Sequence, residues 1–227
     1  SFRSAYNRSV NIRNTPGLTN LTADAYELYE KNGTLYTIVS YDEGQTYEKQ
    51  ADNTLKDVFE HVKAVAVAIK KYHENGYLHL DMKPENVLVI PETKEHVILF
   101  DFDSVVTFEE VKKISGLSYT KGFSAPEQVY GWTDRIGTES DIFSLGALTF
   151  FKLFGRVPVL EDYSLGGEIA ISKMLFWDER YHPRLKKELS YLFQNSLTVS
   201  TITRWSNVDE MIRCLDKLIT LSDLTRV

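Results

Sequence analysis

The sequence predicts an α+β fold in which a short β-containing N-terminal part precedes a mainly helical body. Two β-prone runs, Ala25 to Tyr29 and Leu35 to Tyr41, flank an Asn-Gly pair at residues 32–33, a pattern typical of a β-hairpin. From about Thr54 to Asn75, apolar residues recur at steps of three and four, which predicts a long amphipathic helix. A second helical pattern begins at Asp141 and continues the helical body.

The first elements follow in order along the chain. Residues 1 to about 14 are polar and can form the end of a helix, and the turn signal of residues 15–17 follows them. After the hairpin, Asn53 or Thr54 is expected to cap the long helix, and Gly76 is expected to end it.

The later elements are shorter and more varied. The apolar runs Val87 to Ile90 and Val97 to Phe100 predict two short strands, and residues 104–124 have the mixed composition of a loop. The helix from Asp141 is expected to stop at Gly155. Further helical segments are expected at residues 167–177, 184–196 and 207–220.

Composition restricts the class of protein. With 26 Lys and Arg against 32 Asp and Glu, the net charge is −6, which argues against nucleic acid as a main partner. The single cysteine, Cys214, excludes an intrachain disulfide and favours a reduced, cytoplasmic compartment. No stretch approaches the roughly 18 apolar residues of a membrane span, and no signal peptide is visible.

One stretch concentrates side chains that can do chemistry. Asp81, Lys83 and Asn86 lie within six residues, between the long helix and a β-prone run. Pro84 keeps the segment from continuing as a helix. Such a loop can bring a base, a phosphate-binding charge and a metal ligand to one point. A solvated polar connector with the same residue types is the alternative.

A second acidic group follows the apolar run that ends at Phe100. It consists of Asp101 and Asp103, with Phe102 between them. An acid at the exit of a buried strand is well placed to hold Mg²⁺, which prefers a few carboxylates together with phosphate oxygens. A simple strand-capping role for Asp101 is the alternative.

Taken together, these motifs resemble those of the protein kinase family. HLDMKPEN at residues 79–86 resembles the catalytic loop, and DFD at 101–103 resembles the metal-binding DFG. The order continues with three further motifs: TKGFSAPE at 120–127, SDIFSLG at 140–146, and Arg204-Trp205. Upstream, residues 33–44 resemble the last strand of the small lobe running into the hinge. The match spans roughly residues 15 to 215, and its motifs are specific because they occur in the family's order.

The resemblance implies a protein-kinase-like fold and an activity. Residues 1–41 would be a partial N-lobe, with the end of helix C and the last two strands, and residues 42–227 would be the hinge and the C-lobe. The implied activity is transfer of the γ-phosphate of ATP, with Mg²⁺, to a Ser or Thr hydroxyl of a protein substrate.

The resemblance also assigns roles to individual residues. Asp81 would orient the acceptor hydroxyl and receive its proton, and Lys83 would neutralise charge on the γ-phosphate. A lysine at this place is the Ser/Thr-kinase pattern. Thr120 would link to both residues and shape the acceptor pocket. Asn86 and Asp101 would hold the Mg²⁺ ions that bridge the ATP phosphates.

The nucleotide base would contact a separate set of residues. Leu88 would form the floor beneath adenine, and Val39 would occupy the gatekeeper position. The adenine edge would bond to hinge backbone near Ser40 and Asp42.

The same family pattern implies structural contacts. His79 and Phe102 would stack in a hydrophobic spine, and Asp141 would cap the catalytic-loop backbone. Glu127 and Arg204 would form a buried ion pair.

The sequence departs from the family pattern in three places. No Gly-rich loop and no strand lysine precede the hinge, and residues 1–23 contain no acid. Leu80 replaces the arginine that normally receives an activation-loop phosphate, so control by that phosphorylation is not expected. Asp103 replaces the last glycine of DFG, as in small-molecule phosphotransferases of the aminoglycoside and choline kinase type. Lys83 and the Ala-Pro-Glu at 125–127 favour a protein kinase over these.

The missing small-lobe features leave alternatives. Either the rest of the small lobe lies upstream of Ser1 or comes from a partner, or the chain is degenerate; the polar start without Met favours an upstream segment. A pseudokinase or scaffold that keeps the fold but not the turnover is the alternative to an active enzyme. Residues 1–227 by themselves are expected to show negligible catalysis, because positioning of the phosphates would be lost.

Overall fold

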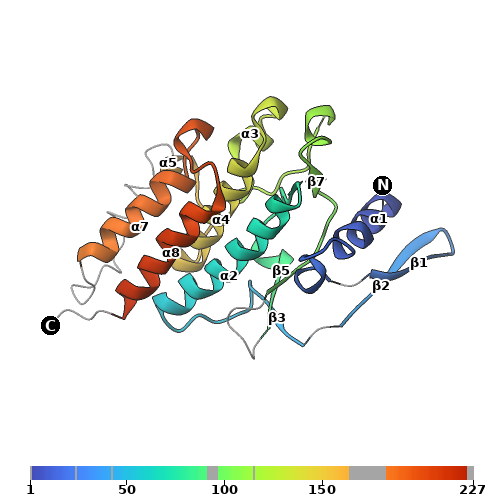
Figure 1. Cartoon of the computed structure of the whole chain (residues 1–227), viewed down its shortest axis with the longest axis horizontal. Coiled ribbons are helices and arrows are strands. Elements are labelled where there is room, and N and C mark those ends of the chain that lie inside the picture. The colour runs from blue at the N-terminus through green and yellow to red at the C-terminus, as the bar shows by residue number, and fades with distance from the viewer. Residues whose placement is uncertain are drawn as a thin grey trace.

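The structure is a computed structural model that describes residues 2–23, 25–41, 43–90, 97–114, 116–163 and 183–223. It has an N-terminal helix and hairpin at one end and a body of packed helices at the other (Figure 1). This arrangement, with small antiparallel sheets between the two ends, confirms the predicted α+β fold class.

The N-terminal end forms as the sequence predicts. Helix α1 (Phe2–Arg13) is followed by strands β1 (Ala25–Lys31) and β2 (Thr34–Val39), which pair as an antiparallel hairpin. The turn between the strands uses Asn32 and Gly33 at φ 53° and 75°, a left-handed backbone that this pair tolerates. Strand β2 ends at Val39, two residues before the predicted limit.

The long helix α2 (Leu55–Glu74) begins where its capping residue predicts. The Thr54 side chain accepts a hydrogen bond from the backbone N of Asp57, and the Asp57 carboxylate accepts one from the backbone N of Thr54. Gly76, at φ 79°, turns the chain out of the helix.

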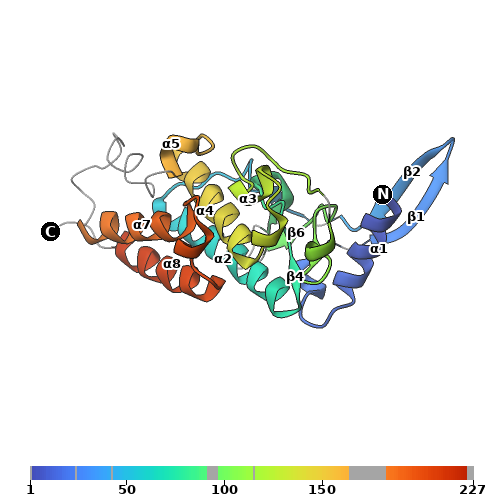
Figure 2. The same cartoon turned by 90° about the horizontal axis from the view of Figure 1, so that it is seen from above.

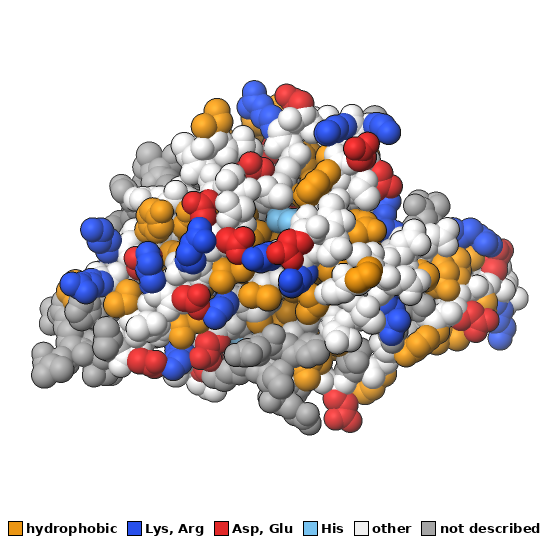
Figure 3. Space-filling model, viewed as in Figure 1, with side chains coloured by type: hydrophobic (Ala, Val, Ile, Leu, Met, Phe, Trp, Pro, Cys, Tyr) orange, Lys and Arg blue, Asp and Glu red, His pale blue; other side chains and the backbone are white. Residues whose placement is uncertain are grey.

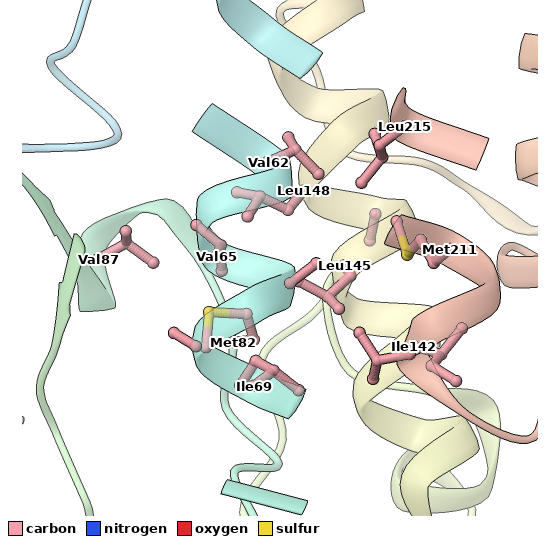
Figure 4. Packing of buried hydrophobic residues seen from close by; sticks show 14 of the residues in the cluster. Val62, Val65, Ile69, Met82, Val87, Ile142, Leu145, Leu148, Met211 and Leu215 are labelled. Carbon is pink, nitrogen blue, oxygen red and sulfur yellow. The ribbon is translucent and has the colours of Figure 1, made fainter. Parts of the chain in front are cut away.

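Within the described ranges, three more long helices belong to the body: α4 (Thr138–Phe154), α7 (Pro183–Ser196) and α8 (Val208–Ser222). Helix α4 starts three residues before the predicted Asp141, and the helix predicted over 167–177 lies outside the described residues. Apolar faces of α2, α4 and α8 meet in the core, as Figure 4 shows with the labelled residues Val62, Val65, Ile69, Ile142, Leu145, Leu148, Met211 and Leu215. Met82, from the segment after α2, is buried in the same core.

Short strands connect the helices and position the loops between them. Strands β3 (Gln45–Thr46), β5 (Val87–Val89) and β6 (Val97–Leu99) form an antiparallel sheet in that order. Strand β4 (Tyr77–Leu78) pairs with β7 (Val106–Thr107). The sequence predicted β5 and β6 but not the three two-residue strands, and β7 lies where a loop was expected.

Two short helices were also not predicted. Helix α3 (Pro126–Val129) follows the loop before α4, and α5 (Leu160–Tyr163) follows α4. No helix in the described ranges combines the length and the apolar character that crossing a membrane requires.

A buried polar cluster fixes the segment that leads into α2. His61 Nδ1 and Asp52 Oδ1 are 2.6 Å apart, and Lys152 Nζ of α4 lies 2.9 Å from Asp52 Oδ2. The three side chains are only 4–8% exposed. Lys152 also donates hydrogen bonds to the backbone oxygens of Tyr47 and Gln50. The cluster therefore ties residues 47–52 to both α2 and α4.

The hairpin leaves an aromatic face uncovered. It projects away from the helical body (Figure 2), and hydrophobic side chains are exposed over this end of the molecule (Figure 3). Tyr29 and Tyr36 stack across the strands with ring centroids 5.2 Å apart, yet each is more than 40% exposed. Ile38 and Val39 are also exposed.

Candidate active site

The loop of residues 79–83 is held from below by a buried carboxylate. Asp141, in the first turn of α4, accepts hydrogen bonds from the backbone nitrogens of His79 and Leu80 at 2.9 and 2.8 Å. The ring of His73 lies 2.8 Å from the same carboxylate. On the other side, the Gln128 side chain donates a hydrogen bond of 2.7 Å to the backbone oxygen of Leu80. The predicted capping by Asp141 is thus confirmed.

Burial and charge act on this support in opposite directions. Burial is the largest single influence and raises the pKa of Asp141, but the hydrogen bond and charge of His73, the charge of His79 and the backbone hydrogen bond from Leu80 together bring the pKa below its usual value. For His79, burial is the main cause and lowers the pKa of the imidazole, against the nearby charges of Asp141, Asp81 and Asp101. The loop therefore rests on an ionised Asp141 and a neutral His79.

Three side chains that the sequence singled out meet at the carboxylate of the fourth, Asp81. Thr120 Oγ1 donates to Asp81 Oδ1 at 2.6 Å, and Lys83 Nζ donates to Asp81 Oδ2 at 2.8 Å. Asn86 Nδ2 donates to the Asp81 backbone oxygen at 2.9 Å and lies 3.1 Å from Oδ2. These contacts fix the carboxylate in one orientation, with its side chain 13% exposed.

Asp101 lies at the end of the same strand pair as Asn86. In the register of β5 and β6, Val87 pairs with Leu99. The backbone N of Phe100 donates to the backbone oxygen of Asn86 at 3.2 Å. Asp101 follows at once, with an exposed side chain and a left-handed backbone at φ 64°. From this position the negative charge of Asp101 raises the pKa of Lys83.

The electrostatics of Lys83 connect the two carboxylates. Burial is the largest single influence and lowers the pKa of the Lys83 ammonium. The hydrogen bond to Asp81 and the charges of Asp81, Asp101 and Glu85 together raise it by more than burial lowers it, so that the net shift of the pKa is upward. Lys83 is therefore a cation that both carboxylates influence.

The donor atoms around this point suit magnesium. The Asn86 nitrogen is occupied by Asp81, which leaves its oxygen Oδ1 as the atom that can bind a cation. The Asp101 carboxylate supplies a second hard oxygen donor. In the part of the chain that the structure describes, no three His, Cys, Asp or Glu side chains cluster to hold a metal by themselves. An amide and one carboxylate fit an Mg²⁺ ion that takes its other ligands from phosphates and water.

The residues expected around adenine lie on strands β2 and β5 and in the segment after β2, and they differ in exposure. Leu88 is half-buried on β5 and pairs with Thr46 of β3, and Val39, at the end of β2, is 54% exposed. Ser40 is half-buried, and Asp42 lies outside the described residues. The chain after it runs close along β5, because a Cβ on Gly44 would lie 2.7 Å from the Val89 oxygen.

Of the remaining predicted contacts, the ion pair is confirmed and the stacking is not. The rings of His79 and Phe102 are neighbours, with centroids 6.5 Å apart, but their planes are tilted by 58° and do not stack. Arg204 forms two hydrogen bonds to the Glu127 carboxylate at 2.6 and 2.9 Å, and both side chains are at most 1% exposed.

The sequence did not identify two residues that shape the loop before α3. Gln128 bonds Leu80, as described, and its oxygen also accepts from the backbone N of Ala125 at 3.2 Å. Gly122 has φ 86°, and a Cβ there would lie 2.6 Å from Cβ of Val157. The signal that could have identified Gln128 is its place three residues after the N-cap residue Ala125, where a capping box has a glutamine or glutamate.

Leu80 has an apolar setting in place of the family's arginine. It is fully buried, with φ 61°, in a small cluster with Leu78, Val106, Val111 and Ile136. Ile114 and Leu117 pack against this cluster. Apolar packing therefore connects the catalytic-loop segment to residues 106–117.

Comparison with known proteins agrees with this geometry. The sequence matches the protein kinase domain over residues 19–218. It is 27% identical over 143 residues to "Myosin light chain kinase, smooth muscle" of Gallus gallus, covering 61% of this chain and 7% of that protein. It is 28% identical over 189 residues to "Myosin light chain kinase 2, skeletal/cardiac muscle" of Mus musculus, covering 79% and 30%.

A third relative, "Myosin light chain kinase 3" of Rattus norvegicus, is 27% identical over 165 residues, with 70% of this chain and 21% of that protein covered. The chain thus spans less than a third of the length of each of these relatives. The domain match covers most of the chain, and it includes the Asp81 loop, Asp101 and the Glu127–Arg204 pair. The chain belongs to the eukaryotic-like Ser/Thr protein kinase family.

Proposed function

We propose that this chain carries the phosphoryl-transfer centre of a Ser/Thr protein kinase, which moves the γ-phosphate of ATP to a protein hydroxyl. The observation that carries the proposal is the Asp81 carboxylate, which Thr120, Lys83 and Asn86 hold through hydrogen bonds of 2.6 to 3.1 Å. Such preorganisation is what phosphoryl transfer needs, since most of its catalysis is positioning and charge neutralisation.

In this proposal Asp81 orients the acceptor hydroxyl and takes its proton. A bond forms between the hydroxyl oxygen and the γ-phosphorus, and the bond from that phosphorus to the bridging oxygen of ADP breaks. Lys83, which is paired with Asp81 and under the charge of Asp101, offsets negative charge on the phosphoryl group. Thr120 keeps the other carboxylate oxygen in place.

Asn86 Oδ1 and the Asp101 carboxylate would hold Mg²⁺. When bound, the ion neutralises charge on the β- and γ-phosphates of ATP. Leu88, Val39 and the backbone near Ser40 and Asp42 would contact adenine, a role that the family match supports.

A protein substrate with a Ser or Thr acceptor is the proposed partner. Lys83, two residues after Asp81, matches the Ser/Thr pattern, and the relatives that match are named as kinases of a protein, myosin light chain. Neither nucleic acid nor a membrane is proposed as a partner, and a cytoplasmic location is proposed from the single, buried cysteine, Cys214.

We also propose that residues 1–41 are part of the N-lobe and that residues 42–227 are the hinge and the C-lobe. The exposed Tyr29, Tyr36 and Ile38 support further strands against the hairpin, since a two-stranded hairpin is marginally stable alone. An upstream segment or a partner would supply these strands. Residues 1–227 alone are expected to transfer phosphate poorly, because a phosphate-covering loop would be lacking.

The test is γ-phosphate transfer from ATP by the protein that includes the covering strands. Asp81→Asn is expected to lower kcat by about 10²- to 10⁴-fold, as for loss of a general base. Asp134→Asn, at an exposed acid outside the site, is the matched control and should retain the wild-type rate. Equal rates for Asp81→Asn and wild type would contradict the proposal.

A scaffold without turnover is the second candidate. It is favoured by α1, which has no acidic residue that could pair with a strand lysine. A scaffold predicts that Mg²⁺ and ATP together leave the melting temperature of the chain unchanged. The kinase proposal predicts a rise that Asp101→Asn removes. A small-molecule kinase, favoured by Asp103, would instead phosphorylate alcohols or aminoglycosides in the same assay.

A further inference from the structure

Helix α1 contacts the turn that follows Asp101. Figures 1 and 2 show the helix beside the segment that joins β6 to β7. Arg8 Nη1 of α1 donates to the backbone oxygen of Asp103 at 3.3 Å and to that of Val105. These contacts join parts of the chain that are 95 and 97 residues apart. A single guanidinium therefore bridges two carbonyl groups of the turn.

The turn has an inner and an outer support. On the inside, the side chains of Phe102 and Val105 are buried, and the backbone N of Val105 donates to the Phe102 oxygen at 3.3 Å. On the outside, Arg8 binds the oxygens of Asp103 and Val105. Asp101 enters this turn with a left-handed backbone at φ 64°, which is unfavourable for a residue with a Cβ and persists only where surrounding contacts hold it.

The charge of α1 suits this contact. Its sequence, FRSAYNRSVNIR, contains three arginines and no acid, so that the charged side chains of the helix are all cationic donors. Arg3 points elsewhere, with Nη2 at 3.5 Å from the exposed Glu30 carboxylate of β1. On the same helix, therefore, Arg8 contacts the turn after Asp101, whereas Arg3 contacts the hairpin.

We propose that Arg8 is a positioning residue that couples the placement of α1 to the turn carrying Asp101, and so sets the orientation of the Asp101 carboxylate toward Mg²⁺. The proposal rests on the proposed function of Asp101 as a metal ligand. It adds that α1 acts on this ligand through a cation and two backbone carbonyls. A displacement of α1 would release the turn.

Two measurements test the coupling. The first is hydrogen–deuterium exchange of residues 101–107 without metal or nucleotide, which reports on the turn itself. The second is binding of a fluorescent ATP analogue, as MgCl₂ is titrated, to the protein that includes the covering strands. Arg8→Ala removes both bonds, Arg8→Lys keeps a cationic donor, and Arg3→Ala is the matched control on the same helix.

For Arg8→Ala we expect faster exchange in residues 101–107 and a roughly tenfold rise in the Mg²⁺ concentration at half-saturation, as loss of a charge-assisted bond predicts. Arg8→Lys should lie between Arg8→Ala and wild type, and Arg3→Ala should match wild type. If Arg8→Ala matches Arg3→Ala in both measurements while the wild type binds nucleotide, the positioning role is overturned. If the wild type binds no nucleotide at any Mg²⁺ concentration, the proposed function falls, and the metal-positioning role falls with it.

Discussion

Removal of Arg204 is expected to destabilise the chain strongly. Arg204 is fully buried, and besides its two bonds to Glu127 it donates to the backbone oxygens of Thr198 and Glu139 at 2.8 and 3.0 Å. The Glu127 carboxylate has one further donor, Ser140 Oγ at 2.7 Å. Arg204→Met keeps much of the side-chain volume and removes the charge. It would leave a buried carboxylate without its cation, and the Ser140 hydroxyl would be its remaining side-chain donor among the described residues.

The magnitude follows from this burial. Breaking a buried ion pair by removing one partner costs about 3–5 kcal/mol. With a urea m-value of about 2 kcal/mol per molar, this corresponds to a midpoint lower by roughly 2 M. The loss is a large part of the roughly 5–15 kcal/mol that stabilises a typical domain.

Equilibrium urea unfolding, followed by tryptophan fluorescence and circular dichroism, measures this change. The control is Lys56→Met, since the Lys56–Asp223 pair at 2.7 Å has side chains 35% and 57% exposed, and exposed pairs contribute about 0–1 kcal/mol. The double variant Glu127→Leu with Arg204→Met should recover part of the loss, because neither charge is left unpaired. The reasoning is refuted if Arg204→Met unfolds within about 1 kcal/mol of Lys56→Met.

Three further predictions concern the loops around the site. Gly122→Ala should lower the free energy of unfolding by about 2 kcal/mol or more, from the left-handed backbone and the contact with Val157. Val157→Gly, which removes the Cβ that a side chain at position 122 would meet at 2.6 Å, should restore only the steric part in thermal melts when measured against Val157→Gly alone, and a wild-type melting temperature for Gly122→Ala would contradict this. Because burial lowers the pKa of His79, the unfolded chain binds its proton more tightly, so stability should fall as pH drops below about 6.5. His79→Phe should flatten this slope in melts between about pH 7.5 and 5.5, and a flat wild-type profile would be the wrong outcome. Alanine at each Ser or Thr of residues 104–119 should leave phosphate transfer by the longer protein nearly unchanged, because apolar packing around Leu80 replaces a phosphate-binding arginine; one large loss would disprove it.

The long helices and the hairpin were predictable because their signals are local. The capping pair of Thr54 and Asp57, the Asn-Gly turn and the periodic apolar residues of α2 act within a few residues of the chain. Their outcome does not depend on distant partners. Strands β3, β4 and β7 have only two residues each, and their existence depends on pairing with distant segments, so no periodicity marks them.

The site was predictable in part for the same reason. Asp81, Lys83 and Asn86 are close in sequence, and their mutual contacts follow from a loop of that length. The meeting of Thr120 with Asp81 across 39 residues required the family resemblance. The contact of Arg8 with the Asp101 turn could not be predicted, because its acceptors are backbone carbonyls, which leave no trace in the sequence.

The polar cluster around Asp52 restricts movement of the chain before α2. Since His61 and Lys152 hold Asp52 from two helices, and β3 is paired to β5, the chain from Gln45 to Asp52 moves as one body with the helices. Any displacement of this segment relative to the helices would have to break the buried pair of Asp52 and Lys152. The cluster thereby fixes the point at which the chain enters the helical body.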